Sequence, residues 1–213
     1  MLSKIDWLKK LETVEQLHQF TDGFKLLYCP WKTIEVAEIA FISLNPGKPP
    51  AGAELRVLSD ERGNSYEIEQ HITRSPITSQ FIKFSSFMNI EPNSILTGVM
   101  CPFRSNRWED FSYQQKQAGI NLGREFLYEV TTKKLKTIVS LGNETTQTIK
   151  DLFDAKLTQE IASGWGEIKL RRFLAANAIN IIQLPHLSTF KLFSGEKYRE
   201  PLETIFSGLR QAQ

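Results

Sequence analysis

Two polar side chains that could do chemistry directly follow apolar stretches of the sequence. Asn45 follows AEIAFISL at 37–44, and His186 follows INIIQL at 179–184 and Pro185. An amide carbonyl can orient a water molecule, although it is too weak a base to remove a proton. An imidazole N–H can stabilise negative charge on a departing group. Together the two side chains could support hydrolysis of a bond whose leaving half becomes negative.

Both residues also have a purely structural interpretation. An asparagine before Pro-Gly is a common turn residue, and a histidine after a strand can be a hydrogen-bonded structural side chain. The other two histidines, His18 and His71, lie on predicted helix or loop segments without catalytic neighbours, and we assign them no role.

Apolar periodicity predicts strands alternating with helices, which is typical of a largely parallel sheet covered on both faces. We expect one α/β domain over 1–213, a three-layer α/β/α arrangement with a central, mostly parallel sheet. It would comprise an N-terminal helical region at 1–36, a core at 37–195 and a C-terminal helix at 196–213. The expected strands are 37–44, 95–100, 137–141 and 179–184; the expected helices are 3–20, 77–89, 112–133, one from Thr145 or Thr146, and 196–210; hairpins are expected at 54–69 and around 164–166.

The expected sheet predicts where a site would lie. Asn45, the Pro102–Arg104 segment and His186 each follow the end of a predicted core strand. In an open parallel sheet, ligands bind beyond the carboxyl ends of the strands. We therefore expect these three loops to converge at one sheet edge.

The composition limits the possible partners and cofactors. At 213 residues the chain suits one hydrophobic core, and its net charge of +2 permits nucleic acid as a partner without requiring it. Two cysteines, Cys29 and Cys101, cannot form a four-cysteine metal or iron–sulfur site, so we expect free thiols and no metal or cofactor. The chain has neither a secretion signal nor an apolar run of about 20 residues, which predicts a cytoplasmic protein without membrane contact.

Four segments in a particular order resemble motifs of the uracil-DNA glycosylase superfamily. SLNPG at 43–47 is similar to the G-x-N-P-G loop of its mismatch-specific, thymine-DNA and single-strand-selective branches, and PHLS at 185–188 is similar to the late H-P-S motif. Between them, SILTGVMCPFRSNRWED looks like a core strand entering a Pro/Arg loop, and KLKTIVSLGNETTQTI looks like a strand, an L-G turn and a helix. The resemblance covers about residues 37 to 195.

This resemblance implies a monofunctional DNA glycosylase, which hydrolyses the N-glycosidic bond of uracil or another modified base flipped out of DNA, single-stranded or duplex. Asn45 would orient the attacking water, and His186 would stabilise the departing base. No metal or redox cofactor is implied. The base pocket would include Leu44, Pro46, Gly47, Tyr66 and Gly98, and the DNA contacts would include Ser188, Thr189, Phe190, Lys191 and Arg104.

Several of these assignments have alternatives. Tyr66 could stack on the flipped base or simply pack in the hairpin. Phe190, Leu192 and Phe193 could fill the space left by the base or belong to the core. Arginines in the predicted loops and strands could form a phosphate track or a solvated face; these are Arg104, Arg107, Arg171 and Arg172.

Three positions depart from the family pattern. Ser43 replaces a glycine, Leu187 replaces a proline, and Gly98 stands where many members have an asparagine that reads the base. An absent side chain at Gly98 predicts extra volume, broad specificity and poor activity on plain uracil, unless close packing requires the glycine. Two other functions remain open: a catalytically silent nucleic-acid-binding protein, and a hydrolase of free nucleosides or nucleotides.

Overall fold

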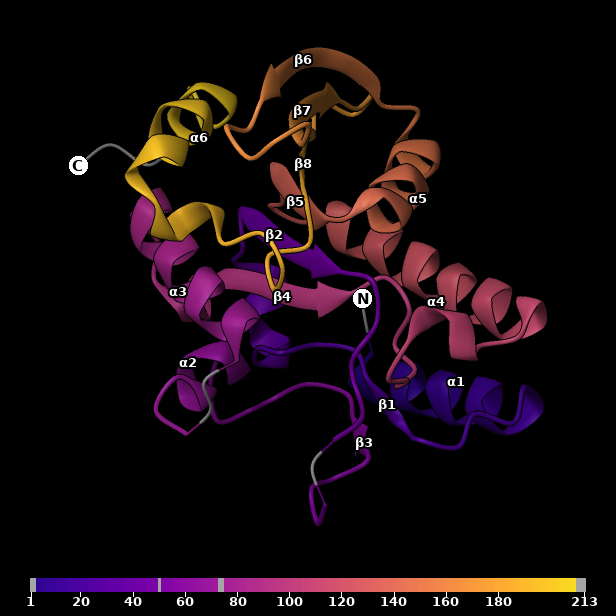
Figure 1. Cartoon of the computed structure of the whole chain (residues 1–213). Helices are drawn as coiled ribbons and strands as arrows, with labels where there is room; N and C mark the ends of the chain where they lie inside the picture. The colour runs from indigo at the N-terminus through magenta and orange to yellow at the C-terminus, as the bar shows by residue number, and fades with distance from the viewer. Residues whose placement is uncertain (1–2, 50, 73–74, 210–213) are drawn as a thin grey trace.

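A computed structural model describes residues 3–49, 51–72 and 75–209 (Figure 1). Its centre is a six-stranded sheet with the strand order β4-β2-β5-β8-β7-β6. The first four strands in this order are parallel to one another, and β7 and β6 continue the sheet as an antiparallel hairpin. In chain order the strands are β2 (Ile39–Ser43), β4 (Ile95–Val99), β5 (Thr137–Leu141), β6 (Lys156–Ala162), β7 (Lys169–Leu174) and β8 (Asn180–Leu184).

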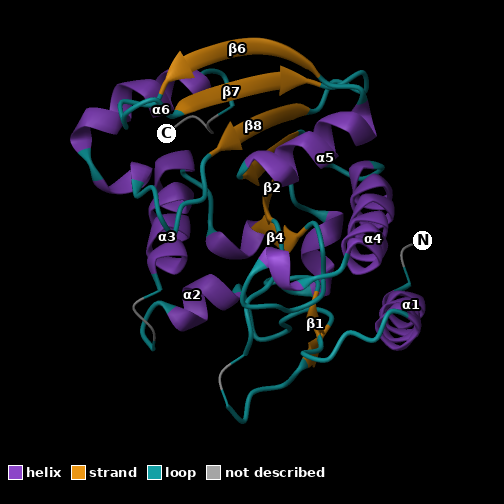
Figure 2. Cartoon of the chain, turned by 45° about the vertical axis from the view of Figure 1, so that its right-hand side comes forward, coloured by secondary structure: helices purple, strands orange, loops and turns teal. Residues whose placement is uncertain are grey.

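Helices cover both faces of this sheet, as Figures 1 and 2 show. One face carries α1 (Lys4–Leu17), α4 (Tyr113–Thr131) and α5 (Asn143–Phe153); the other carries α2 (Ser65–Glu69), α3 (Pro76–Met88) and α6 (Arg199–Ile205). Short 3-10 helices lie at Trp31–Glu35, Pro92–Ser94, Trp108–Asp110, Leu192–Ser194 and Glu196–Tyr198. The expected three-layer α/β/α fold with a mostly parallel sheet is confirmed.

Alternation along the central strands builds a separate core on each face. In β2, Ala40 and Ile42 pack in the cluster beneath α1, α4 and α5, whereas Ile39 and Phe41 pack in the cluster beneath α2, α3 and α6. Successive side chains of a strand point to opposite faces, so a strand buried on both sides is largely apolar. Cys29 and Cys101 are buried free thiols, and burial raises their pKa values to about 11 and about 12.

The parallel register brings the carboxyl ends of four strands to one edge. Ser43 at the end of β2 is level with Val99 at the end of β4, and Leu141 of β5 is level with Leu184 of β8. Beyond β2 and β4 the pairing continues, because Met100 N–H donates to the carbonyl of Ser43 (2.8 Å). The loops expected to share one edge therefore do so.

The prediction of a hairpin at 54–69 is wrong. Residues 56–57 form β3 (Arg56–Val57), which pairs in parallel with β1 (Phe24–Lys25), and residues 65–69 form helix α2. The buried Asn64 is the reason: its Oδ1 caps the helix by accepting from Tyr66 N–H (3.1 Å), and its Nδ2 donates to Thr97 Oγ1 (3.1 Å). An N-cap with tertiary partners outweighs the strand-like alternation of SYEIE.

Smaller differences concern the ends of elements. The region 1–36 contains β1 and a 3-10 helix as well as α1, and α5 begins at Asn143, two residues before Thr145. The last helix is shorter than expected, because a 3-10 turn at Glu196–Tyr198 precedes α6; residues 210–213 of that expected helix lie outside the described residues. Within the described ranges, no helix is long and apolar enough to cross a bilayer.

Candidate functional site

Asn45 is held by its amide nitrogen at the end of β2. Its Nδ2 donates to the carbonyl of Pro46 (3.2 Å) and, more weakly, to that of Ser105 (3.5 Å). No described residue donates a hydrogen bond to its Oδ1. Because these contacts use the N–H groups, the half-buried side chain keeps its carbonyl oxygen as an acceptor for a ligand or water.

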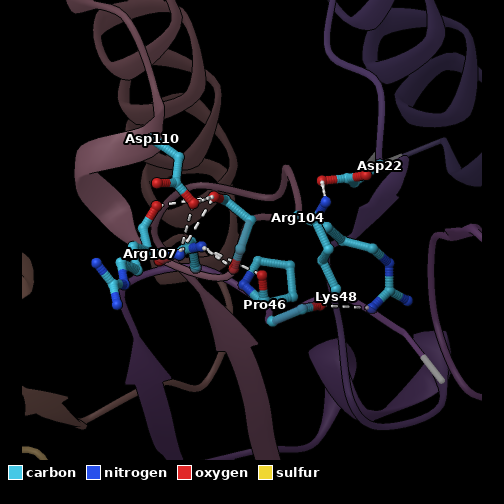
Figure 3. Close-up of polar contacts among 9 residues, drawn as sticks. Asp22, Pro46, Lys48, Arg104, Arg107 and Asp110 are labelled. Atoms are coloured by element: carbon cyan, nitrogen blue, oxygen red, sulfur yellow. Dashed lines mark hydrogen bonds and ion pairs between the residues drawn. The ribbon is translucent and has the colours of Figure 1, made fainter.

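The loop carrying Asn45 is tied to the loop that follows β4 (Figure 3). Ser105 N–H donates to the carbonyl of Pro46 (3.1 Å), and Arg104 Nη1 donates to that of Gly47 (3.2 Å). Arg104 is 8% exposed, and its Nε donates to the carbonyl of Leu55 (3.1 Å). Its guanidinium therefore braces the loop that follows Asn45, and the phosphate contact of Arg104 stays a prediction.

The side chain of His186 is oriented by a neighbouring hydroxyl. Its Nδ1 lies 2.6 Å from Ser188 Oγ. The backbone carbonyl of His186 accepts hydrogen bonds from Thr189 N–H (3.0 Å) and Phe190 N–H (3.1 Å). The residue is exposed, but partial desolvation of the ring lowers the pKa of His186 below its ordinary value. The lowered pKa favours the neutral imidazole, which can both donate and accept a hydrogen bond.

Asn45 and His186 lie at the same sheet edge with one strand between them. Strands β2 and β8 flank β5, so their axes are about 10 Å apart at the usual strand spacing. His186 lines a cavity of about 410 Å³. Its other walls come from the start of α5, the turn before β7, β7 itself and β8, and they include Gln183 and Asn143. Asn45 is not in that wall. The fold brings the two residues to one edge, and a bound molecule would have to span the gap between them.

Tyr66 has no ring face open to a base. It is 5% exposed and stacks on Tyr28, with ring centroids 5.1 Å apart and planes inclined by 9°. Phe81 lies 4.9 Å away, and burial raises the pKa of Tyr66 well above its ordinary value, although a hydrogen bond with the Ser43 side chain opposes this shift. In this structure Tyr66 is a core residue, and the Tyr28 ring that stacks on it is half-buried.

Gly98 leaves no open volume, so the expected enlargement of the base pocket is wrong. A Cβ at this position would lie 3.0 Å from the carbonyl oxygen of Leu26 and 3.1 Å from Leu27 Cδ2. Leu27 also forms an isolated antiparallel bridge with Gly98. The segment before β2 therefore occupies the space beside β4, and close packing explains the glycine.

The residues after His186 divide between surface and core. Thr189 and Lys191 are exposed and Ser188 is half-buried, as contacts to a nucleic acid would require. Leu192 is 1% exposed, and Phe193 packs on Phe84, so both belong to the core. The half-buried Phe190 contacts Trp165 edge to face, with centroids 5.7 Å apart.

Lys191 also borders a second cavity, of about 510 Å³, at the N-terminus of α3. Lys83 and Ser194 share its wall, and Lys83 Nζ donates to Ser194 Oγ (3.0 Å). Thr78, in the first turn of α3, is 1% exposed and lines this cavity, yet none of the described residues forms a hydrogen bond with its Oγ1. Two ammonium groups, a helix N-terminus and an unused hydroxyl favour an anion here.

Sequence reasoning missed two residues near this edge, Lys25 and Tyr28. Both belong to the segment FKLLY at 24–28, which we had assigned to the N-terminal helical region. The alternation of buried Phe24, half-buried Lys25 and buried Leu26 was a detectable strand signal. The segment is too short for that signal to stand out beside the preceding helix.

Neither the models of known protein families nor the sequences of curated proteins match this chain.

Proposed function

We propose that this protein is a DNA glycosylase that hydrolyses the N-glycosidic bond of uracil or another modified base. The observation that carries the proposal is that Asn45 and His186 follow two parallel strands of one sheet. Each side chain is held through one nitrogen, Nδ2 of Asn45 and Nδ1 of His186, and its other polar atom is available to a ligand. The motif order that resembles the uracil-DNA glycosylase superfamily supports the same function.

Asn45 acts on the sugar side of the bond. In the transition state the sugar becomes positive, and water must approach the anomeric carbon. With Nδ2 held by the Pro46 carbonyl, Oδ1 accepts a hydrogen bond from this water and orients its lone pair toward the sugar. Asn45 orients the water and does not itself remove its proton.

His186 acts on the base side. When the Ser188 hydroxyl donates to Nδ1, the ring proton lies on Nε2, which then donates to a carbonyl oxygen of the departing base. One such donor is typically worth about 3 kcal/mol of transition-state stabilisation. The base leaves as an anion, which needs a fixed hydrogen-bond donor and not a full proton. A neutral imidazole is therefore sufficient.

DNA is the substrate we favour over a free nucleoside. The cavity beside Lys191 and Lys83 suits a backbone phosphate, because it combines two ammonium groups with the N-terminus of α3. A free nucleoside has no phosphate that could occupy this cavity.

A panel of oligonucleotides, each carrying one altered base, tests the proposal directly. Abasic sites are quantified after incubation, with matched single-stranded and duplex substrates and an unmodified strand as control. We expect abasic sites to form with at least one altered base and not in the unmodified strand. DNA binding without base release would favour a silent binding protein, and release from free nucleosides or nucleotides alone would favour a nucleoside or nucleotide hydrolase.

A further inference from the structure

The cavity of about 410 Å³ beside His186 has balanced charges in its wall. Lys169 Nζ and Arg171 Nε of β7 lie 2.5 Å and 2.6 Å from the two carboxylate oxygens of Glu160. The exposed Glu167 adds a second carboxylate to the wall. The described residues that line the cavity at the N-terminus of α3, by contrast, include two lysines and no acidic residue. The cavity beside His186 therefore suits an uncharged ligand better than a phosphate.

Two amide side chains give this cavity hydrogen-bonding groups for an uncharged ligand. Gln183 is 7% exposed, and its Nε2 donates to Asn143 Oδ1 (2.6 Å). Its Oε1 has a long contact with Arg171 Nη1 (3.4 Å), and none of the described residues accepts a hydrogen bond from Asn143 Nδ2. An acceptor and a donor therefore remain on two amide groups that are hydrogen-bonded to each other.

An unpaired nucleobase fits these features. A base is planar and uncharged, and its edge carries the neighbouring donors and acceptors that amide side chains bind. The half-buried Phe190 and Pro185 supply apolar surface in the same wall, and bases pack well on aromatic rings. In a duplex a base is stacked and paired, so it must leave the helix to reach a side chain as buried as Gln183. A base of single-stranded DNA reaches it without the cost of unpairing.

The position of the cavity distinguishes this base from the one that is released. The target nucleotide must contact His186 and the water on Asn45 at the same time, so it lies between these two residues. Asn45 is not in the wall of the cavity, whereas β7 is. Strand β7 lies three strands from β2, about 14 Å at the usual spacing, and one strand beyond β8. The cavity therefore extends past His186 and away from Asn45, where a neighbouring nucleotide would lie.

We propose that the cavity beside His186 binds one unpaired base of single-stranded DNA, next to the nucleotide that is attacked, and that Asn143 and Gln183 hydrogen-bond to its edge. The inference rests on the proposed function for the identity of the nucleic acid. It makes single-stranded DNA the preferred substrate class, because a paired neighbouring base cannot enter the cavity.

Equilibrium binding of labelled single-stranded DNA tests the proposal without any need for base release. Two DNA strands of equal length are compared, one with its normal bases and one in which hydrogen replaces every base. The phosphates contribute equally to both, so the unmodified protein should bind the strand with bases at least about 10-fold more tightly. Gln183→Met and Asn143→Ala should each reduce this difference to about 2-fold or less. The control Gln147→Met alters an exposed glutamine one turn further along α5, whose Nε2 donates to Asp151 Oδ1 (2.7 Å), and should keep the full difference.

Equal affinities for the two DNA strands, or a preference for bases that persists in Asn143→Ala, would overturn the inference. Asn143 is exposed, so this variant decides the matter even if the melting temperature shows that Gln183→Met does not fold. Base release without the preference would defeat only this inference. The preference without base release would defeat the proposed hydrolysis and leave a protein that binds single-stranded DNA.

Discussion

The contact between His186 Nδ1 and Ser188 Oγ determines which ring nitrogen can face a ligand. Without the hydroxyl, nothing in the described structure fixes the ring, and the two neutral tautomers become closer in energy. The H-P-S motif that PHLS resembles has a proline where this chain has Leu187, and Leu187 is fully buried in the core. The geometry of the histidine therefore depends on the hydroxyl and on a core contact.

Ser188→Ala should slow base release about 10-fold under single-turnover conditions, because the ring loses its orientation. Ser188→Thr keeps the hydroxyl and should restore most of the rate. Ser86→Ala is a matched control, since Ser86 is an exposed serine on α3 whose Oγ donates to the carbonyl of Ile82. A fall in DNA affinity with an unchanged single-turnover rate would show that Ser188 contacts the backbone instead.

The close packing around Gly98 predicts that a larger residue there lowers the free energy of unfolding. Gly98→Asn places side-chain atoms against Leu26 and Leu27, and overpacking of this kind costs about 1–3 kcal/mol. Gly47→Ala is the control, because its added Cβ meets nothing within 4 Å and should change the free energy of unfolding by less than about 0.5 kcal/mol. Denaturant unfolding measures both. An unchanged stability for Gly98→Asn, with a new preference for uracil, would restore the base-reading role.

At the scale of elements, helix α3 and the loop after β8 together form the candidate phosphate site. Gln80 holds them in place, because its Oε1 accepts from Phe193 N–H (2.9 Å) and its Nε2 donates to Ser194 Oγ (2.6 Å). The first turn of α3 and Lys191 of the loop are thereby kept in the wall of one cavity. Neither segment alone predicts this cavity, since its walls come from residues about 110 positions apart in the chain.

Lys191→Met should weaken binding to all DNA sequences to a similar degree and reduce the salt dependence of binding by about one counterion. The rate of base release from bound DNA should change little, because the lysine does not contact the reacting bond. Lys32→Met, an exposed lysine on the 3-10 helix at Trp31–Glu35, is the control for the loss of one positive charge. Equal salt dependence in both variants would remove Lys191 from the DNA contacts.

At the scale of the whole molecule, patterns in the sequence were enough to predict the layered fold. The strands at 95–100, 137–141 and 179–184 are largely apolar segments closely followed by proline or glycine, and the helices between them have clear apolar stripes. The contacts of Asn64 with Thr97 and of Leu26 with Gly98 were out of reach, because they join residues far apart in sequence. Those contacts determine that Tyr66 lies in the core and that Gly98 has no open space beside it. The base pocket was therefore the least predictable part of the site.

The most direct test of the account is single-turnover base release by Asn45→Ala and His186→Ala on the best substrate of the panel. Each variant should be slowed about 100-fold or more, while its DNA affinity changes much less, because phosphate contacts dominate binding. His71→Ala, which alters an exposed histidine, should release base at the unmodified rate. The proposed roles of Asn45 and His186 would be contradicted if both variants released base at the unmodified rate. They would also be contradicted if weaker DNA binding accounted for the whole loss of rate.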